Sequence, residues 1–301
     1  MGIADLIPGV SGGTLALIIG IYTRLILAIS SLAKLLQART WFNLFSGQSK
    51  RTLSKFDLSF LIPLGLGVIT SILAFSRLIL YLLENHAIPV WSFFLSLIVF
   101  SAIALFRPLA SSLISVLLLS FGVLVALGIN ALGTTDTTGG NLKIFVSGVL
   151  AISAMVLPGI SGSLVLVMLG EYQTMLAALH DFNFMLIFLF ILGCGIGLLV
   201  TTQFLRWLVS YYKNETLAFF CGFMLGSAPR LWPWQMKADL VDQAAVMFQA
   251  RDMVLLSPFS FQYYSRQQPQ LTEALLALLF AAILSFFLHR RNQKNIDNSF
   301  H

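Results

Sequence analysis

Residues 8–12 read PGVSG, and residues 158–162 read PGISG. Each copy interrupts an apolar stretch, although proline and glycine are unfavourable inside a helix. At an offset of 150, the stretch ADLIPGVSGGTLALIIGIY (4–22) aligns with AMVLPGISGSLVLVMLGEY (154–172), with Pro, Gly, Ser and Gly in the same order. The same interruption therefore occurs in both halves of the chain, and this repeat decides the fold that we expect.

The composition identifies the class of protein. The chain has 301 residues, of which 58% are hydrophobic and 10% are charged, and its mean hydropathy is +0.89. A soluble domain carries roughly a quarter of charged residues, so a soluble globule is excluded. The sequence predicts a polytopic helical membrane protein, and the net charge of +6 then indicates basic cytoplasmic loops rather than nucleic-acid binding.

Eight apolar segments are expected to be helical. They lie at about 14–36, 58–83, 90–106, 110–131, 143–179, 184–210, 215–233 and 271–288. Lys and Arg residues gather in the 37–57 loop and after residue 288, so we place this loop and the C-terminus on the cytoplasmic side. The connections 84–89 and 132–142 contain neither residue type and are expected outside.

Tracing the chain between these two sides predicts two hairpins. Residues 143–179 must enter and leave on the external face, which makes them a re-entrant hairpin broken at Pro158. By the same logic the first motif belongs to a hairpin that opens inward. The expected fold is an all-α polytopic membrane protein with two inverted-topology repeats, 1–141 and 142–301, each with a re-entrant broken-helix hairpin followed by transmembrane helices. Such repeats are typical of secondary transporters; the alternative is that both motifs are simple turns.

Two segments depart from the repeat. The polar stretch 234–270 of the second repeat contains FSFQYYSR (259–266), whose aromatic and basic residues predict an external interfacial segment that covers the site. In the first repeat only seven residues precede Pro8, whereas an apolar arm, 143–157, precedes the second motif. We therefore expect either that the first hairpin lacks most of one arm or that the natural start lies upstream.

The two motifs predict an anion-binding cradle. A break inside the bilayer frees backbone groups that protein, water or ligand must satisfy. The helix that begins after such a break offers N–H donors and a partial positive charge, which favour phosphate. Glycine allows close approach of the backbone to a ligand, and serine adds a hydroxyl group. The candidate phosphate-binding residues in motifs 8–13 and 158–163 and beside them are Gly9, Ser11, Gly12, Gly13, Thr14, Gly159, Ser161, Gly162 and Ser163.

Charged residues inside apolar segments extend this candidate site. Arg77 and Arg206 occupy matching repeat positions once one residue of slippage is allowed. Arginine suits phosphate, and intramembrane charge usually serves function; the alternative is that each side chain snorkels to the headgroups. Asp5 and Glu171 are the acids nearest the motifs. We interpret them as carriers of a coupling proton or as arginine partners, the alternative being ordinary helix-end carboxylates.

Other classes of function fit parts of the sequence. GVSG (9–12) and GISG (159–162) match the G-x-S-G pattern of rhomboid intramembrane proteases. A nucleophilic serine needs a general base, and none of the four histidines lies inside an apolar segment, so we expect no enzyme. A structural protein or ion channel would explain the helices but not the paired arginines. We expect no cofactor and no metal.

The N-terminal MGIADLIPGVSGGTLALIIGIY (1–22) and the later LPGISGSLVLVMLGEY (157–172) resemble the motif pair of the bacterial polyprenyl-phosphate transporters, formerly a domain-of-unknown-function family. The resemblance covers nearly the whole chain. It implies a flippase of the bacterial cytoplasmic (inner) membrane that returns undecaprenyl phosphate to the inner leaflet for cell-envelope synthesis. Its partners would be this lipid and membrane lipid, with no nucleic acid. Family members usually carry an extra stretch before the first motif, in agreement with the missing arm.

The expected mechanism is alternating access. The phosphate head enters against motif 158–163, is held by Arg77 and Arg206 and leaves inward past motif 8–13, while a proton on an acid couples the cycle to the membrane potential. The alternative is a transporter of another small or lipid-linked anion. Whether the protein is a monomer or a homodimer is left open.

Overall fold

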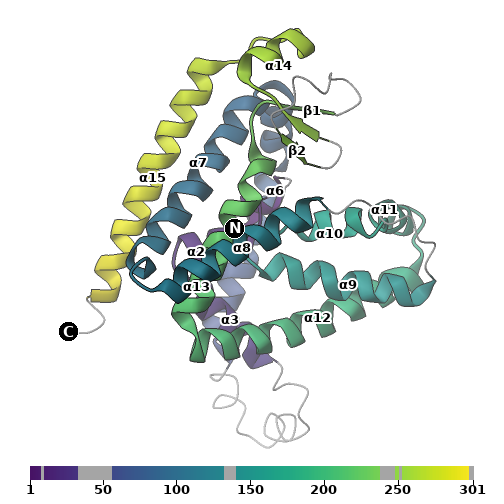
Figure 1. Ribbon diagram of the computed structural model, residues 1–301. Coiled ribbons are helices and arrows are strands. Elements are labelled where there is room, and N and C mark those ends of the chain that lie inside the picture. Colours follow the sequence, from purple (N-terminus) through teal and green to yellow (C-terminus); the bar gives the residue numbers. More distant parts are fainter. Residues whose placement is uncertain (8–9, 33–55, 132–139, 238–247, 251–252, 298–301) are drawn as a thin grey trace, which may run out of the picture. The chain divides into compact units, whose positions relative to one another are not determined.

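The computed structural model describes residues 1–7, 10–32, 56–131, 140–237, 248–250 and 253–297 (Figure 1). The helices of the first part of the chain are α1 (Gly2–Asp5), α2 (Gly12–Ile18), α3 (Tyr22–Leu32), α6 (Leu58–Asn85), α7 (Ala87–Phe106), the 3₁₀ helix η3 (Arg107–Leu109) and α8 (Leu113–Ala131). The later helices are α9 (Asn141–Val156), α10 (Gly162–Met168), α11 (Tyr172–His180), α12 (Phe184–Tyr211), α13 (Lys213–Ser227), η4 (Ala228–Leu231), α14 (Pro258–Ser265) and α15 (Leu271–Asp297). Three short strands are β1 (Gln235–Lys237), β2 (Phe248–Ala250) and β3 (Met253–Leu255).

The helices confirm an all-α polytopic membrane protein. Within the described ranges, four helices are long and apolar enough to cross a membrane, namely α6, α7 with η3, α12 and the Leu271–Arg290 part of α15. The pair α10 and α11 is bent by 105° and would make a fifth crossing if it were a single span. At 1.5 Å per residue the seven residues of α10 reach only ~10 Å. This length fits a re-entrant segment, and the inverted orientation of the two halves stays a prediction.

In the structure each motif is followed by a second helix break. The prediction of a continuous helix over 14–36 missed the first of these breaks. Helix α2 ends before Gly20, whose φ is 79°, and α3 begins two residues later. Helix α10 likewise ends before Gly170, whose φ is 72°. A left-handed backbone suits glycine and ends a helix. The continuous helix was therefore wrong, although the alignment already pairs Gly20 with Gly170.

Contacts among the described residues divide the chain into two compact units. The first consists of 1–76 and 134–216, and the second consists of 77–133 and 217–301. Each unit therefore takes one segment from each of the two repeats predicted from the sequence. The division into repeats 1–141 and 142–301 stays a prediction. In packing, each compact unit combines residues of both predicted repeats.

Helix α9 packs along α12 in the first unit (Figure 1). Glycines make this contact close, because a Cβ atom at Gly197 would lie 2.6 Å from the Val149 carbonyl oxygen. A Cβ at Gly193 would overlap the Phe145 carbonyl oxygen. Small residues allow helix backbones to approach one another in this way in membrane proteins. The α9 arm of the second hairpin is thus fixed against a long membrane helix.

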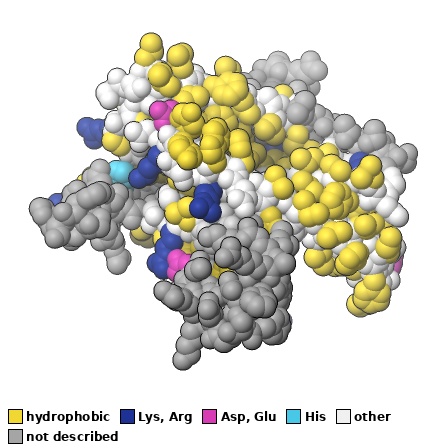
Figure 2. Space-filling model, turned by 90° about the horizontal axis from the view of Figure 1, so that it is seen from below, with side chains coloured by type: hydrophobic (Ala, Val, Ile, Leu, Met, Phe, Trp, Pro, Cys, Tyr) yellow, Lys and Arg dark blue, Asp and Glu magenta, His cyan; other side chains and the backbone are white. Residues whose placement is uncertain are grey.

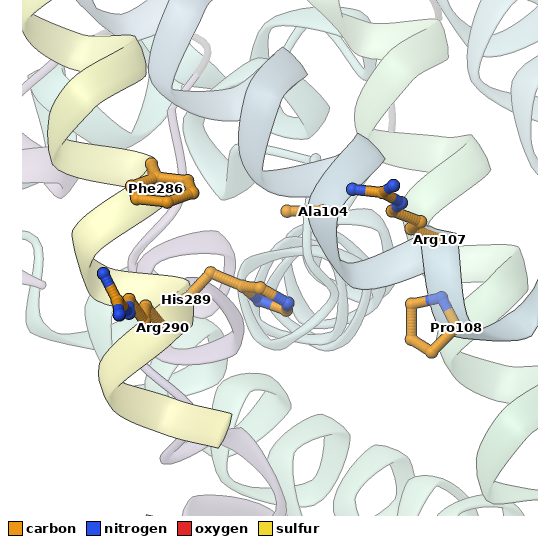
Figure 3. Close-up of a pocket in the computed structure, with 6 residues that line it drawn as sticks. All are labelled: Ala104, Arg107, Pro108, Phe286, His289 and Arg290. Carbon is orange, nitrogen blue, oxygen red and sulfur yellow. The ribbon is translucent and has the colours of Figure 1, made fainter. Parts of the chain in front are cut away.

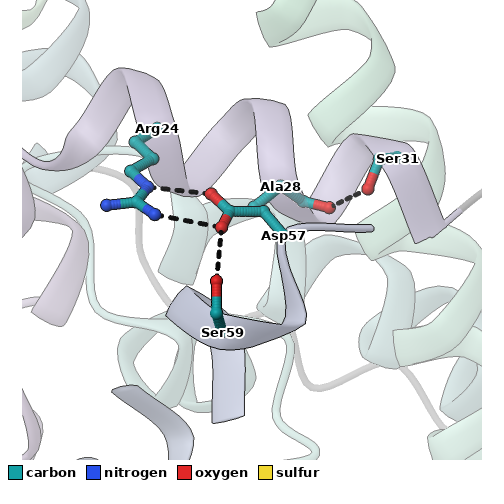
Figure 4. A network of polar contacts seen from close by, with 5 residues as sticks. All are labelled: Arg24, Ala28, Ser31, Asp57 and Ser59. Carbon is teal, nitrogen blue, oxygen red and sulfur yellow. Dashed lines mark hydrogen bonds and ion pairs between the residues drawn. The ribbon is translucent and has the colours of Figure 1, made fainter. Parts of the chain in front are cut away.

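An ion pair joins α3 to the start of α6 in the first unit (Figure 4). The Arg24 guanidinium donates two hydrogen bonds to the Asp57 carboxylate, with N–O distances of 2.8 and 3.0 Å. These bonds hold the pKa of the Asp57 carboxyl below its usual value. Ser59 also donates to this carboxylate, over 3.3 Å. The pair is exposed, so it orients the two helix ends more than it stabilises the fold.

Helices α7 and α15 lie side by side in the second unit (Figure 1). The Ser96 hydroxyl donates to the Leu278 carbonyl oxygen over 2.7 Å, and the Ser101 and Ser285 hydroxyls are 2.8 Å apart. The step from Ser96 to Ser101 along α7 matches the step from Leu278 to Ser285 along α15, so the two helices run parallel. This direction agrees with the predicted topology, in which the connection 84–89 before α7 is outside and the C-terminus after α15 is cytoplasmic, so that both helices run inward.

A small sheet caps the second unit. Strand β3 pairs antiparallel with β1 and β2, in the order β1-β3-β2. Trp234, Val254 and Leu256 of this region pack with Phe261 of α14 and with Ile88 at the start of α7. The sequence predicted an interfacial segment over 234–270 but missed its strands, because each strand is only three residues long. Whether the segment is external stays a prediction.

The surface is strongly apolar. Figure 2 shows broad areas of hydrophobic side chains on one face. Exposed fractions reach 75% for Leu73 of α6, Leu142 of α9 and Phe184 of α12. Of the residues of α6, only Ile79 is buried. Such continuous apolar surface requires a lipid environment, which agrees with a multi-pass membrane protein.

Candidate functional site

The first motif places its own oxygen atoms on the N-terminus of α2. Ser11 precedes this helix, and its hydroxyl oxygen accepts a hydrogen bond from the Gly13 N–H over 3.0 Å. The Asp5 carboxylate, at the end of α1, accepts from the Gly12 N–H over 2.7 Å. A carboxylate at this position is favoured by the helix dipole. Two of the donors expected to meet a ligand are therefore already bonded within the protein.

The second motif has the same backbone plan with different capping. Gly159 lies between α9 and α10 with a φ of 95°, which glycine adopts without strain. Ser161 precedes α10, but its side chain makes no capping hydrogen bond. Its hydroxyl instead lies 2.7 Å from the hydroxyl of Ser163. Among the described residues, no side chain caps the N-terminus of α10 as Ser11 and Asp5 cap that of α2.

The alignment accounts for the carboxylate that caps α2 and is missing at α10. At the offset of 150, Asp5 corresponds to Met155, so the second motif has no carboxylate where the first has one. Apart from this pair, the alignment keeps Pro, Gly, Ser and Gly in place. The two motifs are therefore similar in backbone and different in charge.

Three hydrogen bonds join the first motif and the residues after it to the second motif and the end of α9. The Ser11 hydroxyl donates to the Met155 carbonyl oxygen over 3.1 Å. The Gly159 N–H donates to the Thr14 hydroxyl oxygen over 2.8 Å. Tyr22, which follows the Gly20 turn, donates its hydroxyl to a carbonyl oxygen at the end of α9 over 3.3 Å. The structure thus brings together motifs that lie about 150 residues apart in the chain.

Three candidate glycines allow protein groups to approach one another. A Cβ atom at Gly12 would lie 2.7 Å from an Asp5 carboxylate oxygen, and one at Gly13 would lie 2.8 Å from the Val156 carbonyl oxygen. A Cβ at Gly162 would lie 2.7 Å from the Ala151 carbonyl oxygen. The sequence indicated glycines that admit a ligand, whereas Gly13 admits the end of α9 from the other hairpin, and Gly12 and Gly162 admit groups of their own hairpins. Their substitution is expected to change packing before it changes binding.

A hollow of about 180 Å³ lies where the motifs meet. It is lined by Asp5, Val10, Ser11, Met155, Ser161, Gly162 and Ser163. One water molecule requires only ~10–15 Å³ of such space, so the hollow has room for a larger polar group. Three hydroxyls and one carboxylate are therefore collected in one hollow.

The remaining predicted site residues lie elsewhere or beside the hollow. Gly9 is outside the described residues. Thr14 is buried and accepts the hydrogen bond from the second motif described above. Arg206 is exposed on α12 and does not line the hollow, and Arg77 is exposed on α6 at the first residue of the second unit. A role in phosphate binding stays a prediction for both arginines.

Glu171 has a partner that the sequence analysis did not anticipate. It lies between α10 and α11 and is 4% exposed, and its carboxylate is 2.8 Å from the Lys143 ammonium group. A buried carboxylate needs such a cation. A signal for this pair was available, since Lys143 is the only Lys or Arg between Arg107 and Arg206. The proposed coupling role of Glu171 is untested, but its charge is already balanced.

Among the described residues, neither Ser11 nor Ser161 is hydrogen-bonded to a His, Lys, Asp or Glu side chain. The hydrogen bonds of Ser11 reach Met155 and Gly13, and that of Ser161 reaches Ser163. His180 ends α11 and bonds to the neighbouring Asp181. Among the described residues, no group of three or more His, Cys, Asp or Glu side chains is arranged to hold a metal ion.

Residues 1–247 match the family described as "Undecaprenyl phosphate translocase-like". The chain belongs to this family. It is also similar to a "Polyprenyl-phosphate transporter" of Vibrio cholerae serotype O1, at 37% identity over 98% of this chain and 94% of that protein. A "Polyprenyl-phosphate transporter" of Staphylococcus aureus is 31% identical over 77% of this chain and 83% of its own length. No solved structure matches the chain.

Proposed function

We propose that this chain transports polyprenyl phosphate across the bacterial cytoplasmic membrane, from the outer to the inner leaflet. The observation that carries the proposal is the polar hollow between the two motifs, in a chain whose relatives are named for this substrate. The substrate class joins a phosphate to a long hydrocarbon tail. The hollow suits the first part and the apolar surface of the protein suits the second.

The hollow offers donors to a phosphate head. The Ser161 and Ser163 hydroxyls are bonded only to each other among the described residues, so both can turn towards a phosphate oxygen. The Ser11 hydroxyl lines the same space. Hydrogen bonds to an ionised acceptor are about twice as strong as those between neutral groups. Three hydroxyls therefore supply a head site without a lysine.

Asp5 makes phosphate binding depend on a proton. Its carboxylate lines the same hollow, and two negative groups in a poorly solvated space repel one another. Protonation of Asp5 removes this repulsion, so the protonated protein binds phosphate more tightly. By linkage, phosphate binding then also favours protonation. We assign the coupling role to Asp5 rather than Glu171, because Glu171 is paired with Lys143.

Coupling to a proton also supplies the driving force. Moving one negative charge inward against an inside-negative potential costs ~2.3 kcal/mol per 100 mV. A proton that moves inward with the phosphate cancels one such charge. The hydrocarbon tail stays in lipid beside the exposed apolar helices, so only the head crosses through protein. Transport of another lipid-linked anion would use the same physics.

The test uses proteoliposomes with labelled polyprenyl phosphate and follows its accessibility in the outer leaflet to an impermeant phosphatase. The protein is expected to accelerate the loss from the outer leaflet. Ser161→Ala/Ser163→Ala is expected to slow this loss by roughly 5- to 150-fold, since each lost hydrogen bond costs about 0.5–1.5 kcal/mol and the two together cost about 1–3 kcal/mol. The matched control is Ser76→Ala/Ser120→Ala, which removes two hydroxyls from exposed helix positions.

Two outcomes would contradict the proposal. An unchanged outer-leaflet population in the presence of folded protein excludes a flippase for this lipid. Equal acceleration of phosphatidic acid shows a broader carrier of lipid phosphates. Ser11→Ala/Ser161→Ala separates the enzyme alternative, because it is expected to weaken a carrier and to abolish a serine hydrolase.

A further inference from the structure

A second hollow, of about 530 Å³, lies in the second unit at the C-terminal ends of α7 and α15 (Figure 3). It is lined by Ala104, Arg107, Pro108, Phe286, His289 and Arg290. Figure 3 shows His289 extending from α15 towards the space between the two helices. None of its described lining residues is acidic, and all of them belong to the second unit, whereas those of the hollow between the motifs belong to the first.

The hollow concentrates positive charge. Arg107 and Arg290 are both exposed, and neither forms a salt bridge within the described part of the chain. Two guanidinium groups in one hollow repel each other unless an anion lies between them. Arginine also presents paired donors that match the oxygens of a phosphate. The charge alone therefore indicates a phosphate-bearing ligand.

Apolar stripes lead from these arginines along both helices. On α7, Phe100 and Ile103 are 48% and 51% exposed and precede Arg107 by seven and four residues. On α15, Ile283 and Phe286 are 55% and 60% exposed and precede Arg290 by the same intervals. Residues three, four and seven apart share one helix face. Each helix thus presents an apolar stripe that ends at an arginine.

This arrangement has the amphipathic pattern of a lipid. Because α7 and α15 run parallel, both stripes end in arginines at the same side of the membrane. Ala104 is small and leaves the space between the helices open at this level. A free phosphate would use only the arginines, whereas a lipid also covers the stripes. Basic pockets between membrane helices are suited to anionic headgroups.

We propose that the hollow between Arg107 and Arg290 binds the headgroup of an anionic, phosphate-bearing lipid, with its hydrocarbon chains along the stripes of α7 and α15. This site is separate from the hollow between the motifs, and it does not depend on whether the chain transports anything. The same chemistry fits an anionic phospholipid of the bilayer and a polyprenyl phosphate.

The experiment measures lipid binding to the full-length protein by native mass spectrometry from detergent micelles. Phosphatidylglycerol and the zwitterionic phosphatidylethanolamine are titrated separately. Arg107→Gln/Arg290→Gln is expected to bind phosphatidylglycerol roughly 30-fold more weakly, since each basic residue near the headgroup contributes about fivefold. The control Lys213→Gln/Arg266→Gln removes two exposed charges that do not line the hollow and is expected to bind like the wild type.

A second titration identifies the source of the phosphate. Polyprenyl phosphate is added to protein already loaded with phosphatidylglycerol. If polyprenyl phosphate displaces phosphatidylglycerol from the wild type but not from Arg107→Gln/Arg290→Gln, the polyprenyl lipid uses the hollow. If it does not displace phosphatidylglycerol from the wild type, the hollow is a site for bilayer phospholipid. Both results support a phosphate-headgroup site.

The proposal is overturned if the arginine variant binds phosphatidylglycerol as tightly as the control does. It is also overturned if phosphatidylethanolamine binds as tightly as phosphatidylglycerol. Thermal unfolding in detergent checks that the variant is folded. If the Gln variant is not folded, Arg107→Lys/Arg290→Lys is used, because it keeps the charge and removes the paired donors. This Lys variant is expected to bind phosphatidylglycerol several-fold more weakly than the wild type. Unchanged binding overturns the match between guanidinium and phosphate.

Discussion

Asp5 gives the first motif a neighbouring carboxylate that the second motif lacks. It accepts a hydrogen bond from the Gly12 N–H and lines the hollow, whereas its counterpart Met155 is uncharged. A carboxylate that both caps a helix and faces a substrate site has two competing roles. The cap favours the charged form, and a bound phosphate favours the neutral form. This competition makes Asp5 suitable for a coupled proton.

Asp5→Asn tests this coupling. Asparagine keeps an oxygen for the Gly12 N–H but takes up no proton. If one proton moves with each lipid, the equilibrium distribution of polyprenyl phosphate in wild-type proteoliposomes is expected to shift about tenfold per pH unit of imposed gradient. In the variant this response is expected to disappear, while exchange without a gradient persists. The measurement is the leaflet distribution at a series of gradients.

The matched control is Asp57→Asn, which removes an exposed carboxylate that bonds to Arg24. It is expected to keep the full response to the gradient. A full response in Asp5→Asn would show that another group carries the proton, and Glu171 with Lys143 would then be the next pair to change.

Helix α12 shows how glycine position decides packing between elements. Gly193 faces α9, where a Cβ atom would overlap the Phe145 carbonyl oxygen. Gly195, two residues further on, has no atom within 4 Å of its Cβ position. Both glycines lie in the sequence LGCG (192–195), and the sequence does not tell them apart. Only the packed helix shows which one is needed.

This difference gives a paired prediction. Gly193→Ala is expected to destabilise the protein by about 1–3 kcal/mol, because the added carbon atom forces α9 away from α12. Gly195→Ala is expected to be neutral or to stabilise the helix by about 0.5–1 kcal/mol. Thermal unfolding of both variants in the same detergent measures the difference. Equal effects of the two substitutions would contradict the close contact between the helices.

At the scale of the whole molecule, the predicted orientation makes corresponding helices of the two repeats cross in opposite directions. Helix α6 is predicted to run outward and α12 to run inward. Single cysteines at Asn85 and Asp181 are therefore expected to react with an impermeant thiol reagent added outside. Cysteines at Ser112 and Lys213 are expected to react only after the membrane is permeabilised. The measurement is labelling in intact and in permeabilised cells.

The protein used for this test has both native cysteines replaced by alanine, so that the reagent labels only the introduced cysteine. Of the native ones, Cys194 is partly exposed and Cys221 is buried. Labelling of Asn85→Cys and Lys213→Cys from the same side would exclude the inverted topology and leave a tandem repeat. Labelling of all four sites in the reverse pattern would keep the inverted repeat and reverse the orientation of the chain.

The sequence by itself determined the class of the protein, the bounds of most long helices and the family. Low charge and recurrent apolar runs require lipid as the solvent, and these are properties of composition that do not depend on packing. The pairing of PGVSG with PGISG likewise follows from residue order alone. It indicated where both helices break, since proline and glycine act on the local backbone.

Only the tertiary structure decided which groups face one another. Three contacts join residues through space. They are the hydrogen bond from the Gly12 N–H of α2 to the Asp5 carboxylate, the pairing of Glu171 with Lys143 and the approach of Gly13 to the end of α9. A repeat alignment carries no information on these contacts, because it compares the two motifs without placing them together. The sequence therefore determined which segments break, and packing decided that several of their freed backbone groups are bonded to side chains of the same two segments around one small polar hollow.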